Sequence, residues 1–348
     1  MIVDAPLRLQ LDSAALVTNW RWLAARSGAA SCGAAVKADG YGLGAVEVVR
    51  RLVTAGCRDF YVATWAEAVA LGKTPAGASL SVLHGVRAED MAVAVASMAR
   101  PTLNTFEQVA RWKSTGRPCD VMIDTGMNRL GLSVADVLAG ALDGLVIDTL
   151  MSHLACADED SPMNARQLAA FGTLRGKTSA KRMSLANSAG ICLGGDYSFD
   201  LTRPGLALYG GIPRAEAVGH INQVATPQAQ ILQRRRVSAG ESVGYNATFT
   251  ARTETEVAII NLGYADGYLR GFSAPDGIKG GSAEGGVLPL IGRVSMDLVA
   301  LDVSATPEHA EGDWLSLDYD LPSASATSGL SQYELLTGLG ARYERVWM

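Results

Sequence analysis

The sequence predicts an α/β protein with a (β/α)8 barrel of the TIM type, followed by a mostly antiparallel β domain. Three observations lead to this prediction. Short apolar segments alternate with helix-like stretches from about residue 30 to 215, and there are eight such apolar segments. Eight strands with helical connections favour a barrel over a doubly wound sheet. After about residue 216, Val, Ile, Thr and Tyr stand between turn residues, as in antiparallel sheets.

The barrel prediction starts from the eight apolar segments and the helices expected between them. Several helix-like stretches begin with Ser, Thr, Asn or Asp and end in Gly, as helix boundaries do. The expected strands are 32–38, 59–64, 78–85, 100–104, 119–126, 145–155, 181–187 and 199–205. The expected helices are 44–56, 66–72, 88–98, 106–116, 133–144 and 161–176, with a shorter one after Asn187.

The sequence after about residue 216 predicts strands joined by turns. We expect the barrel to occupy residues 7–215 and the β domain to occupy 216–348, with residues 1–6 as candidates to join the β domain. Two stretches rich in Gly, Ser, Ala and Pro, 273–286 and 322–329, are expected to be loops. The expected strand segments are 226–237, 241–253, 255–268, 285–304 and 312–320.

Composition excludes several classes of protein. The net charge of −5 and the lack of a basic block argue against nucleic-acid binding. The first residues lack the pattern of a signal peptide, and no apolar run is long enough to span a membrane, so a cytoplasmic protein is expected. Five cysteines are scattered singly, which fits reduced thiols and offers no metal framework, so no metal is expected.

Polar residues follow the expected strands repeatedly. Parallel strands of a barrel place their carboxyl ends on one face, where barrel enzymes carry their chemistry. A single histidine at a strand end is usually a hydrogen-bonded part of the structure, so the shared placement is what favours a site. The residues at these ends are Lys37, His84, Asn104, Asp124, Arg129, His153, Asn187, Ser188 and Arg203.

The segment around Lys37 has two readings. Its glycines at 40, 42 and 44 resemble a nucleotide-binding turn, but their spacing is GxGxG and the next strand closes on Thr64 rather than on an acidic residue. The stretches 186–190 and 203–210 follow the last two strands, where barrels often bind phosphate. A phosphate site facing a lysine across the barrel mouth suggests pyridoxal phosphate, held as an imine on Lys37.

With these residues assembled, the chain resembles alanine racemase, a pyridoxal-phosphate enzyme family built from a barrel and a β domain. The resemblance covers nearly the whole length, and its motifs occur in the family's order. They are AVKADGYGLG around Lys37, DTGMNRLG (124–131), SHLACAD (152–158), ANSAG (186–190), RPGLALYG (203–210), GYNATFT (244–250), GYADGYLR (263–270), GRVSMD (292–297) and YELLTGLGARYERVW (333–347).

The resemblance implies a two-base mechanism. Lys37 would form the internal aldimine with pyridoxal 5′-phosphate and act as one base. Tyr245 would be the other base, supplied by the partner subunit of a homodimer with shared active sites. In the family, a hydrogen-bonded chain through the residues that match His153 and Arg203 helps to tune the tyrosine, and Arg203 would also face the pyridine nitrogen.

The resemblance also assigns cofactor, substrate and entrance residues. Arg129 would contact the cofactor and the substrate carboxylate. The phosphate would be bound by Tyr41, Ser188, Gly205, Leu206 and Tyr333. From the partner subunit, Met296 would meet the substrate carboxylate and Tyr264 would line the entrance. Asp158, Arg270 and Arg293 match the family's entrance residues, although each of these three is also compatible with a surface ion pair.

Three positions depart from the family's pattern. Leu43 stands where many members have histidine, and Asn128 replaces a common glycine beside Arg129. Met122 occupies a site that in some members is a carbamylated lysine holding the arginine. A methionine cannot be carbamylated, so Arg129 has to be positioned in another way.

The leading hypothesis is therefore interconversion of L- and D-alanine, with D-alanine supplied for peptidoglycan. One alternative is a racemase for another small amino acid such as serine. Another is a non-enzymatic pyridoxal-phosphate protein, a class that lacks the domain carrying Tyr245. A decarboxylase is disfavoured by the GYADG and SMD motifs, and a nicotinamide enzyme is disfavoured by the glycine spacing around residues 40–44.

Overall fold

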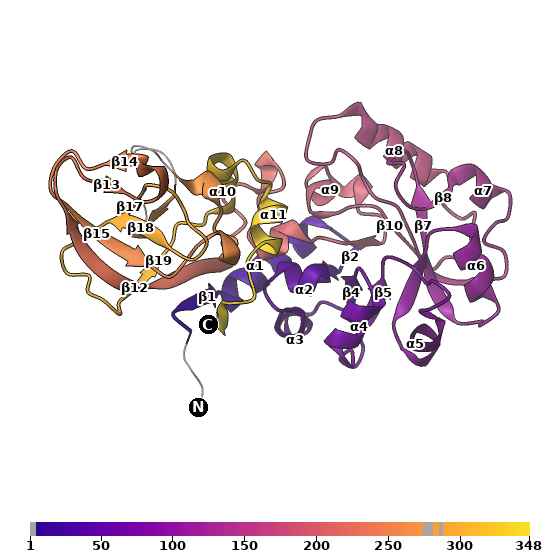
Figure 1. Cartoon of the computed structure of the whole chain (residues 1–348). Helices are drawn as coiled ribbons and strands as arrows, with labels where there is room; N and C mark the ends of the chain where they lie inside the picture. Colours follow the sequence, from indigo (N-terminus) through magenta and orange to yellow (C-terminus); the bar gives the residue numbers. More distant parts are fainter. Residues whose placement is uncertain (1–4, 274–280, 285–287) are drawn as a thin grey trace. The chain divides into compact units, whose positions relative to one another are not determined.

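The computed structural model describes residues 5–273, 281–284 and 288–348 (Figure 1). The chain divides into two compact units. The barrel unit comprises residues 16–208 and 212–222, and the β unit comprises residues up to 15, 209–211 and 223–348. Within the described residues, no helix is both long and apolar enough to cross a membrane.

The barrel unit contains the parallel strands that the sequence predicts, so the expected fold class is confirmed. Neighbouring strands pair in parallel along the order β3-β4-β5-β6-β7-β9-β10, and the short strand β8 (Leu132–Ser133) pairs with β7. The strands are β2 (Ser31–Cys32), β3 (Ala34–Ala35), β4 (Asp59–Val62), β5 (Ser79–Val82), β6 (Arg100–Leu103), β7 (Pro118–Asp124), β9 (Val146–Met151), β10 (Arg182–Ser184) and β11 (Leu201–Thr202).

Backbone hydrogen bonds close this curved sheet into a ring. Strand β11 pairs in parallel with β2. On its other side, the Arg203 N–H donates to the Ala186 carbonyl at 2.9 Å, just beyond the end of β10. The Ala35 N–H donates to the Pro204 carbonyl at 2.9 Å, which continues the pairing from β2 into β3. Because β2 and β3 act as one interrupted strand, segment 31–205, which the structure describes throughout, forms an eight-stranded barrel.

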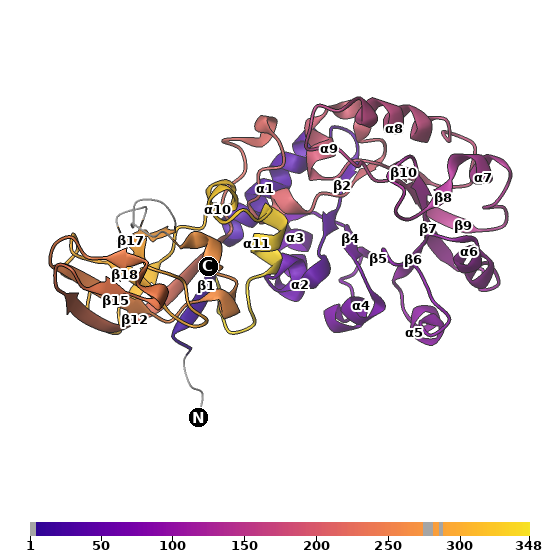
Figure 2. The ribbon, with the colours of Figure 1, turned by 45° about the horizontal axis from the view of Figure 1, so that its top comes forward.

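Helices follow the strands and lie around them, as Figure 2 shows for α4, α6 and α8. Most begin at a polar cap. Thr64, for example, forms a reciprocal capping box with Glu67, and Ser133 forms one with Asp136. The helices are α1 (Ser13–Arg26), α2 (Lys37–Tyr41), α3 (Ala45–Ala55), α4 (Trp65–Leu71), α5 (Met91–Ala96), α6 (Phe106–Lys113), α7 (Val134–Leu138), α8 (Pro162–Gly172) and α9 (Ser188–Cys192).

Charged residues are concentrated at the amino-terminal ends of the barrel strands. Arg182 forms ion pairs with Asp59 at 2.9 Å and with Asp148 at 2.7 Å. Arg100 lies 3.2 Å from Asp148 and 3.5 Å from Asp120. Burial raises the pKa of the fully buried Asp120 carboxyl, whereas Arg100 lowers it. This ionic layer lies at the end of the barrel opposite to the predicted site, so we assign it to structure rather than to catalysis.

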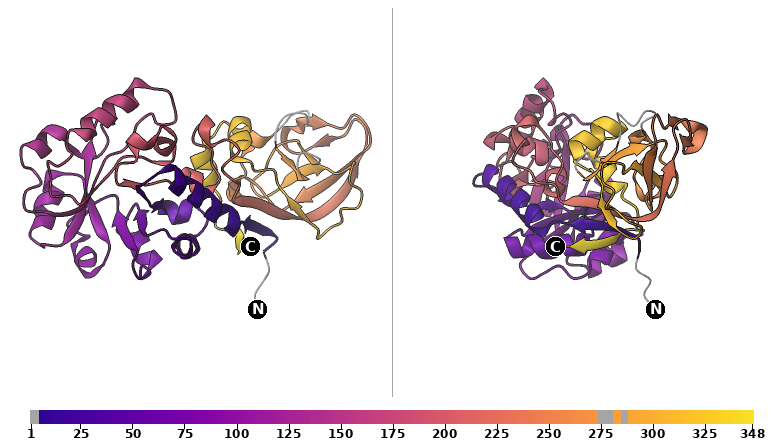
Figure 3. Two further views of the ribbon diagram at one scale, coloured as in Figure 1. Left: turned by 180° about the vertical axis from the view of Figure 1, so that it is seen from behind. Right: turned by 90° about the vertical axis from the view of Figure 1, so that its left-hand side faces the viewer.

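The β unit is built on a mostly antiparallel sheet, drawn in orange and yellow in Figure 3 apart from the indigo strand β1. Its strand order is β16-β17-β18-β15-β12-β1-β20, and β19 pairs with β12. Its strands are β1 (Leu7–Leu11), β12 (Ala225–Val237), β15 (Thr255–Ile260), β16 (Ser282–Ala283), β17 (Leu288–Ile291), β18 (Val299–Asp302), β19 (Trp314–Ser316) and β20 (Glu344–Trp347), with a separate hairpin of β13 (Ser242–Val243) and β14 (Phe249–Thr250).

Two segments of the chain differ from the expectations, and a third cannot be compared. Residues 7–11, expected to open the barrel, form β1 in the β unit's sheet, because alternate leucines are buried there. The prediction of a loop at 322–329 is wrong. It forms helix α10 (Leu321–Ser328), which Asp320 caps by accepting the Ser323 N–H and which Gly329 ends at a φ of 77°. The other predicted loop, 273–286, lies mostly outside the described residues.

Candidate active site

Lys37 stands two residues beyond the end of strand β3 and begins an unusual turn. The five residues after it all have positive φ: Ala38 and Asp39 at 51°, Gly40 at 64°, Tyr41 at 56° and Gly42 at 85°. Left-handed backbone costs roughly 1–2 kcal/mol for each residue that has a side chain. Three such residues within four positions, Ala38, Asp39 and Tyr41, require strong tethers from the surrounding structure. Backbone strain of this kind is typical of functional sites.

Side chains and backbone groups tether this left-handed turn at both ends. At its start, the Ala38 N–H donates to Glu67 Oε1 at 2.8 Å. At its end, the Ala45 N–H donates to Asp39 Oδ1 at 2.8 Å, and the Gly44 N–H donates to the Asp39 carbonyl at 2.9 Å. The turn therefore fixes the direction in which the chain leaves β3 beside Lys37.

Three cations lie near His153, which follows strand β9. Burial lowers the pKa of His153 to about 3, and Arg203, Arg129 and Lys37 each lower it as well. The histidine is therefore neutral at ordinary pH. Burial also lowers the pKa of Lys37, as does Arg129, whereas Glu67 raises it.

The charges of these cations are not neutralised by ion pairs in the described part of the chain. Among the described residues, none of Lys37, Arg129 and Arg203 forms an ion pair. Arg203 is buried, and its partners among the described residues are neutral oxygens, the Ser184 hydroxyl and the Ser152 carbonyl. Arg129 is exposed and has no hydrogen-bond partner in the described chain. The cluster is a positively charged site suited to an anion.

A compact cradle lies where strands β10 and β11 end. Ser188 opens α9, is 2% exposed, and its Oγ accepts the N–H groups of Gly205 at 3.0 Å and Ala207 at 3.2 Å. Because both bonds use the oxygen as acceptor, the hydroxyl hydrogen is left to donate elsewhere. A Cβ on Gly205 would stand 2.2 Å from the Tyr41 hydroxyl, so only glycine lets the two segments approach. Leu206 follows, buried, at the start of a 3-10 turn (Leu206–Tyr209).

The β unit brings two of its predicted residues together. The Ala265 N–H donates to the Met296 carbonyl at 3.0 Å, and the Tyr264 N–H donates to the Ser295 carbonyl at 3.0 Å. A Cβ on Gly263 would stand 2.2 Å from the Met296 carbonyl oxygen, so the two loops are in direct contact. The loops that carry Tyr264 and Met296 therefore form one surface.

Buried Asp266 holds these loops. Arg342 donates to both of its carboxylate oxygens, at 2.6 and 2.8 Å, and a third bond from Arg342 reaches Asp297 at 2.7 Å. Asp266 also accepts the Gly263 N–H at 3.0 Å. The Arg342 guanidinium thus connects segment 263–268, through Asp266, and segment 295–297, through Asp297, to the chain near residue 342.

The remaining predicted residues lie in more open positions. Tyr245 and Arg293 line one cavity of about 680 Å³ in the β unit, and the Tyr245 side chain is 65% exposed. The Arg270 guanidinium lies 5.4 Å from the Tyr264 ring centroid. Tyr333 is exposed in the first turn of α11 (Gln332–Thr337), and Asp158 is exposed in the loop after β9.

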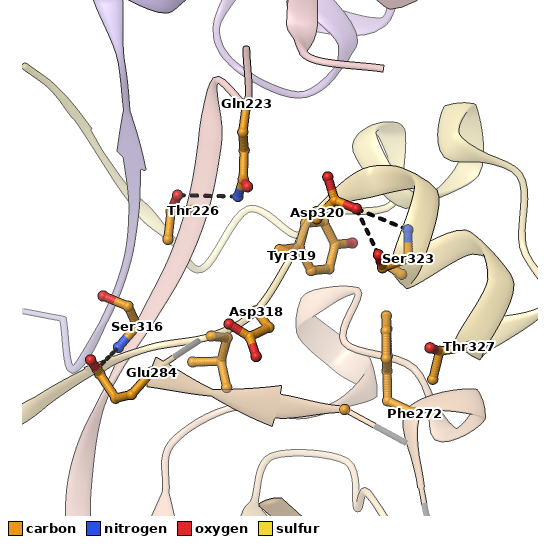
Figure 4. Close-up of a pocket in the computed structure, with 13 residues that line it drawn as sticks. Gln223, Thr226, Phe272, Glu284, Ser316, Asp318, Tyr319, Asp320, Ser323 and Thr327 are labelled. Carbon is orange, nitrogen blue, oxygen red and sulfur yellow. Dashed lines mark hydrogen bonds between the residues drawn. The ribbon is translucent and has the colours of Figure 1, made fainter. Parts of the chain in front are cut away.

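A second cavity of the β unit, of about 500 Å³, contains none of the predicted residues (Figure 4). Its polar groups are largely committed to local structure. Asp320 accepts bonds from Ser323 as the cap of α10, and Glu284 accepts the Ser316 N–H. We therefore assign no function to this cavity.

The sequence reasoning did not single out Glu67, Ser184, Asp266 or Arg342. The TxxE pattern at 64–67 marks a helix start but does not show that one carboxylate oxygen reaches the chain beside Lys37. Asp266 lies inside a quoted motif, yet its bidentate partner comes from 76 residues later. Contacts of that range leave no local signal in a sequence.

Comparisons with known proteins match the chain over both units. A family model described as the N-terminal domain of alanine racemase matches residues 11–213, and one for the C-terminal domain matches residues 224–347. The chain is 39% identical to a biosynthetic alanine racemase of Agrobacterium fabrum, over 99% of this chain and 94% of that protein. It is 42% identical to an alanine racemase of Rhodospirillum rubrum, over 97% of this chain and 94% of that protein.

Solved structures give the same result. An alanine racemase of Bartonella henselae with covalently bound pyridoxal phosphate superposes with a TM-score of 0.89 at 33% identity, covering 99% of this chain and 100% of that one. The biosynthetic alanine racemase of Pseudomonas aeruginosa superposes with a TM-score of 0.87 at 32% identity, with the same coverage.

Proposed function

The chain belongs to the alanine racemase family, and from this premise we propose that it interconverts L-alanine and D-alanine with pyridoxal 5′-phosphate as its cofactor. Its D-alanine would supply peptidoglycan. The observation that carries the proposal is the cluster of Lys37, Arg129 and Arg203 beside neutral His153, without an ion-pair partner in the described chain. Such a site suits an anionic cofactor and an amino-acid carboxylate.

The residues present fit this cofactor. Ser188 keeps a hydroxyl hydrogen to donate, and the close approach of Gly205 to Tyr41 forms a cradle of small groups in which phosphate oxygens would lie. Leu206 and Tyr333 would add to the phosphate contacts. Lys37 would hold the aldehyde carbon, and its lowered pKa favours the neutral amine that this bond requires.

Racemisation requires two proton-transfer groups on opposite faces of the substrate carbon. When bound, the cofactor supplies an electron sink that acidifies the α-hydrogen. Lys37 would move the proton on one face and Tyr245 of the partner subunit on the other. His153 is held neutral, so it can accept as well as donate a hydrogen bond, and it would orient the tyrosine together with Arg203.

Arg203 and Arg129 would bind different groups, the cofactor and the substrate carboxylate. Arg203 is buried, and its guanidinium keeps its charge at every working pH. Facing the pyridine nitrogen, it would keep that nitrogen unprotonated and so limit side reactions. Arg129 is exposed and close enough to Lys37 to lower its pKa, so it would meet the substrate carboxylate as substrate enters.

A shared active site explains why the two proposed bases lie in different units. We propose that the barrel unit, residues 16–208 and 212–222, binds the cofactor and that the β unit completes the site of the partner subunit in a homodimer. The exposure of Tyr245 and Met296, both more than half exposed in the single chain, supports this arrangement. Met296 would contact the substrate carboxylate, and Tyr264, Asp158, Arg270 and Arg293 would line the entrance.

The test is racemisation by the purified full-length chain. With pyridoxal 5′-phosphate present, L-alanine should be converted to D-alanine, and the protein should show visible absorbance from the bound cofactor. Lys37→Ala should remove both signals. A wild-type protein that takes up the cofactor but leaves L-alanine unchanged would overturn the proposal. The ratio of kcat/KM for alanine and serine then establishes the preferred substrate.

A further inference from the structure

We propose that Glu67 is the positioning residue of Lys37, fixing by its carboxylate both the exit direction and the charge state of the lysine. The inference rests on the proposed function, in which Lys37 carries the cofactor and moves a proton. Nothing in the family motifs quoted above includes Glu67. It lies in the first turn of α4, one strand away from Lys37.

The geometry shows one carboxylate joining the ends of two neighbouring strands. Glu67 Oε2 accepts the Ala63 N–H at 2.6 Å and the Thr64 N–H at 3.3 Å, directly after β4. Glu67 Oε1 accepts the Ala38 N–H at 2.8 Å, directly after Lys37. The residue that follows the lysine is thereby fixed to the neighbouring strand end through a single planar group.

A capping role alone does not account for this arrangement. In a capping box the N3 carboxylate needs only to reach back to its own N-cap, as Asp136 does toward Ser133 at the start of α7. Glu67 makes that bond to Thr64 with one oxygen and directs the other away from its own helix to Ala38. Ala38 is also the first left-handed residue of the turn, so this contact lies where the backbone most requires support.

Glu67 also provides the negative charge close to Lys37. Burial and Arg129 lower the pKa of the lysine, and Glu67 opposes them. The other charged group near the site is Arg203, and His153 is neutral there. A lysine that both receives and returns a proton works best with a pKa near the working pH, and loss of the Glu67 charge should lower the pKa of Lys37 further. Position and charge therefore depend on the same side chain.

Two variants separate the effect of the length of the Glu67 side chain from the effect of its charge. Glu67→Gln keeps the length but loses the charge, and its NH2 group cannot accept a backbone N–H. Glu67→Asp keeps the charge but is one methylene too short to bond at both strand ends. Asp136→Asn is the matched control, because it removes a capping-box carboxylate far along the chain from Lys37.

The first measurement needs no cofactor. Reductive methylation of the cofactor-free full-length protein across pH, followed by mass spectrometry of the peptide that contains Lys37, gives the titration midpoint of its amine. We expect the midpoint to fall in Glu67→Gln, and to stay near the wild-type value in Glu67→Asp and Asp136→Asn. Equal midpoints in all four proteins would contradict the role of the charge.

The second measurement follows loading of pyridoxal 5′-phosphate onto Lys37, trapped by borohydride at set times. Glu67→Asp, in which the lysine keeps its titration midpoint, should load about tenfold more slowly than wild type, because the lysine is no longer held in one direction. Loading at the rate of Asp136→Asn would overturn the inference. A wild-type protein that carries no cofactor on Lys37 would instead refute the proposed function, while the midpoints would still test the effect of Glu67.

Discussion

The protonation of His153 depends strongly on its surroundings. Its folded pKa of about 3 lies far below the ordinary histidine value of 6.5, because burial and three cations oppose a further positive charge. In the unfolded chain the same histidine takes up a proton as pH falls below about 6.5. Between these two values the unfolded state binds more protons, so acidification favours unfolding.

This gives a prediction of pH-dependent stability. As pH falls from 6.5 to 4.5, the unfolding free energy of wild type should decline more steeply than that of His153→Gln, by up to about 1.4 kcal/mol per pH unit. Urea unfolding of both cofactor-free proteins at several pH values measures the difference. Other titrating groups are common to both proteins and cancel. Parallel curves would show that His153 is protonated in the folded state.

Gly205 permits a second prediction for a single residue. Its φ is ordinary for any residue, so the obstacle to alanine is the end of the Tyr41 side chain, whose hydroxyl oxygen and Cζ would lie 2.2 and 2.9 Å from the new Cβ. We expect Gly205→Ala to lower the unfolding free energy by about 1–3 kcal/mol, as overpacking does, and to weaken cofactor binding about tenfold or more. Thermal unfolding and a titration with pyridoxal 5′-phosphate measure the two effects.

Gly172 provides the matched control for this substitution. It lies in helix α8, and a Cβ there would meet nothing within 4 Å. Gly172→Ala should leave cofactor affinity unchanged. Equal affinities in both alanine variants would mean that the approach of Gly205 to Tyr41 is not part of the phosphate site.

Among the elements, the loops 263–268 and 295–297 depend on the Asp266–Arg342 pair. Asp266 is buried, whereas Arg342 is half exposed. Removing the arginine alone leaves a buried carboxylate without its cation, so Arg342→Met should cost about 2–4 kcal/mol of unfolding free energy. Arg252→Met, at an exposed position of the same unit, should change it by less than about 0.5 kcal/mol.

A double-mutant cycle tests this pair directly. In Asp266→Asn with Arg342→Met, no charge remains buried, so the loss should fall short of the summed single losses by about 1–3 kcal/mol. Chemical denaturation of the four proteins gives the coupling. Additive losses would show that the two side chains act independently.

Sequence patterns predicted the helices and strands correctly where neighbouring residues determine the secondary structure. The barrel strands and their polar ends were predictable because apolar runs, caps and glycines occur at regular spacing. Helix α10 was missed because its serines and alanines resemble a loop until Asp320 and Gly329 are recognised as its caps. The left-handed turn could not be predicted, because Ala38 and Asp39 adopt positive φ only under tethers such as Glu67, which is distant in sequence.

At the scale of the whole molecule, the proposed dimer makes a prediction about mixed subunits. If Lys37 of one chain works with Tyr245 of the partner subunit, a dimer of Lys37→Ala with Tyr245→Ala has one intact site and one doubly altered site. Mixing the two inactive variants under subunit exchange should then restore about a quarter of wild-type activity, since half of the dimers are mixed and each has one working site. Racemisation assays before and after mixing measure the recovery.

The alternative arrangement predicts a different result. If each site were formed within one chain, every site in the mixed dimer would carry one altered base, and mixing would restore nothing. A sedimentation or light-scattering measurement alongside the assay shows whether exchange took place. Exchange without recovered activity would refute the shared site.

The place of strand β1 has a consequence for synthesis. Barrel strands pair mostly with the strand that precedes or follows them, so they can associate as the chain leaves the ribosome. Strand β1 is made first, yet it pairs with β12 (Ala225–Val237) and β20 (Glu344–Trp347). The side chains of Leu7, Leu9 and Leu11, which are buried in the folded protein, therefore stay exposed to solvent until β12 has been translated. A nascent chain halted before residue 225 would display this strand to chaperones even after its barrel had folded.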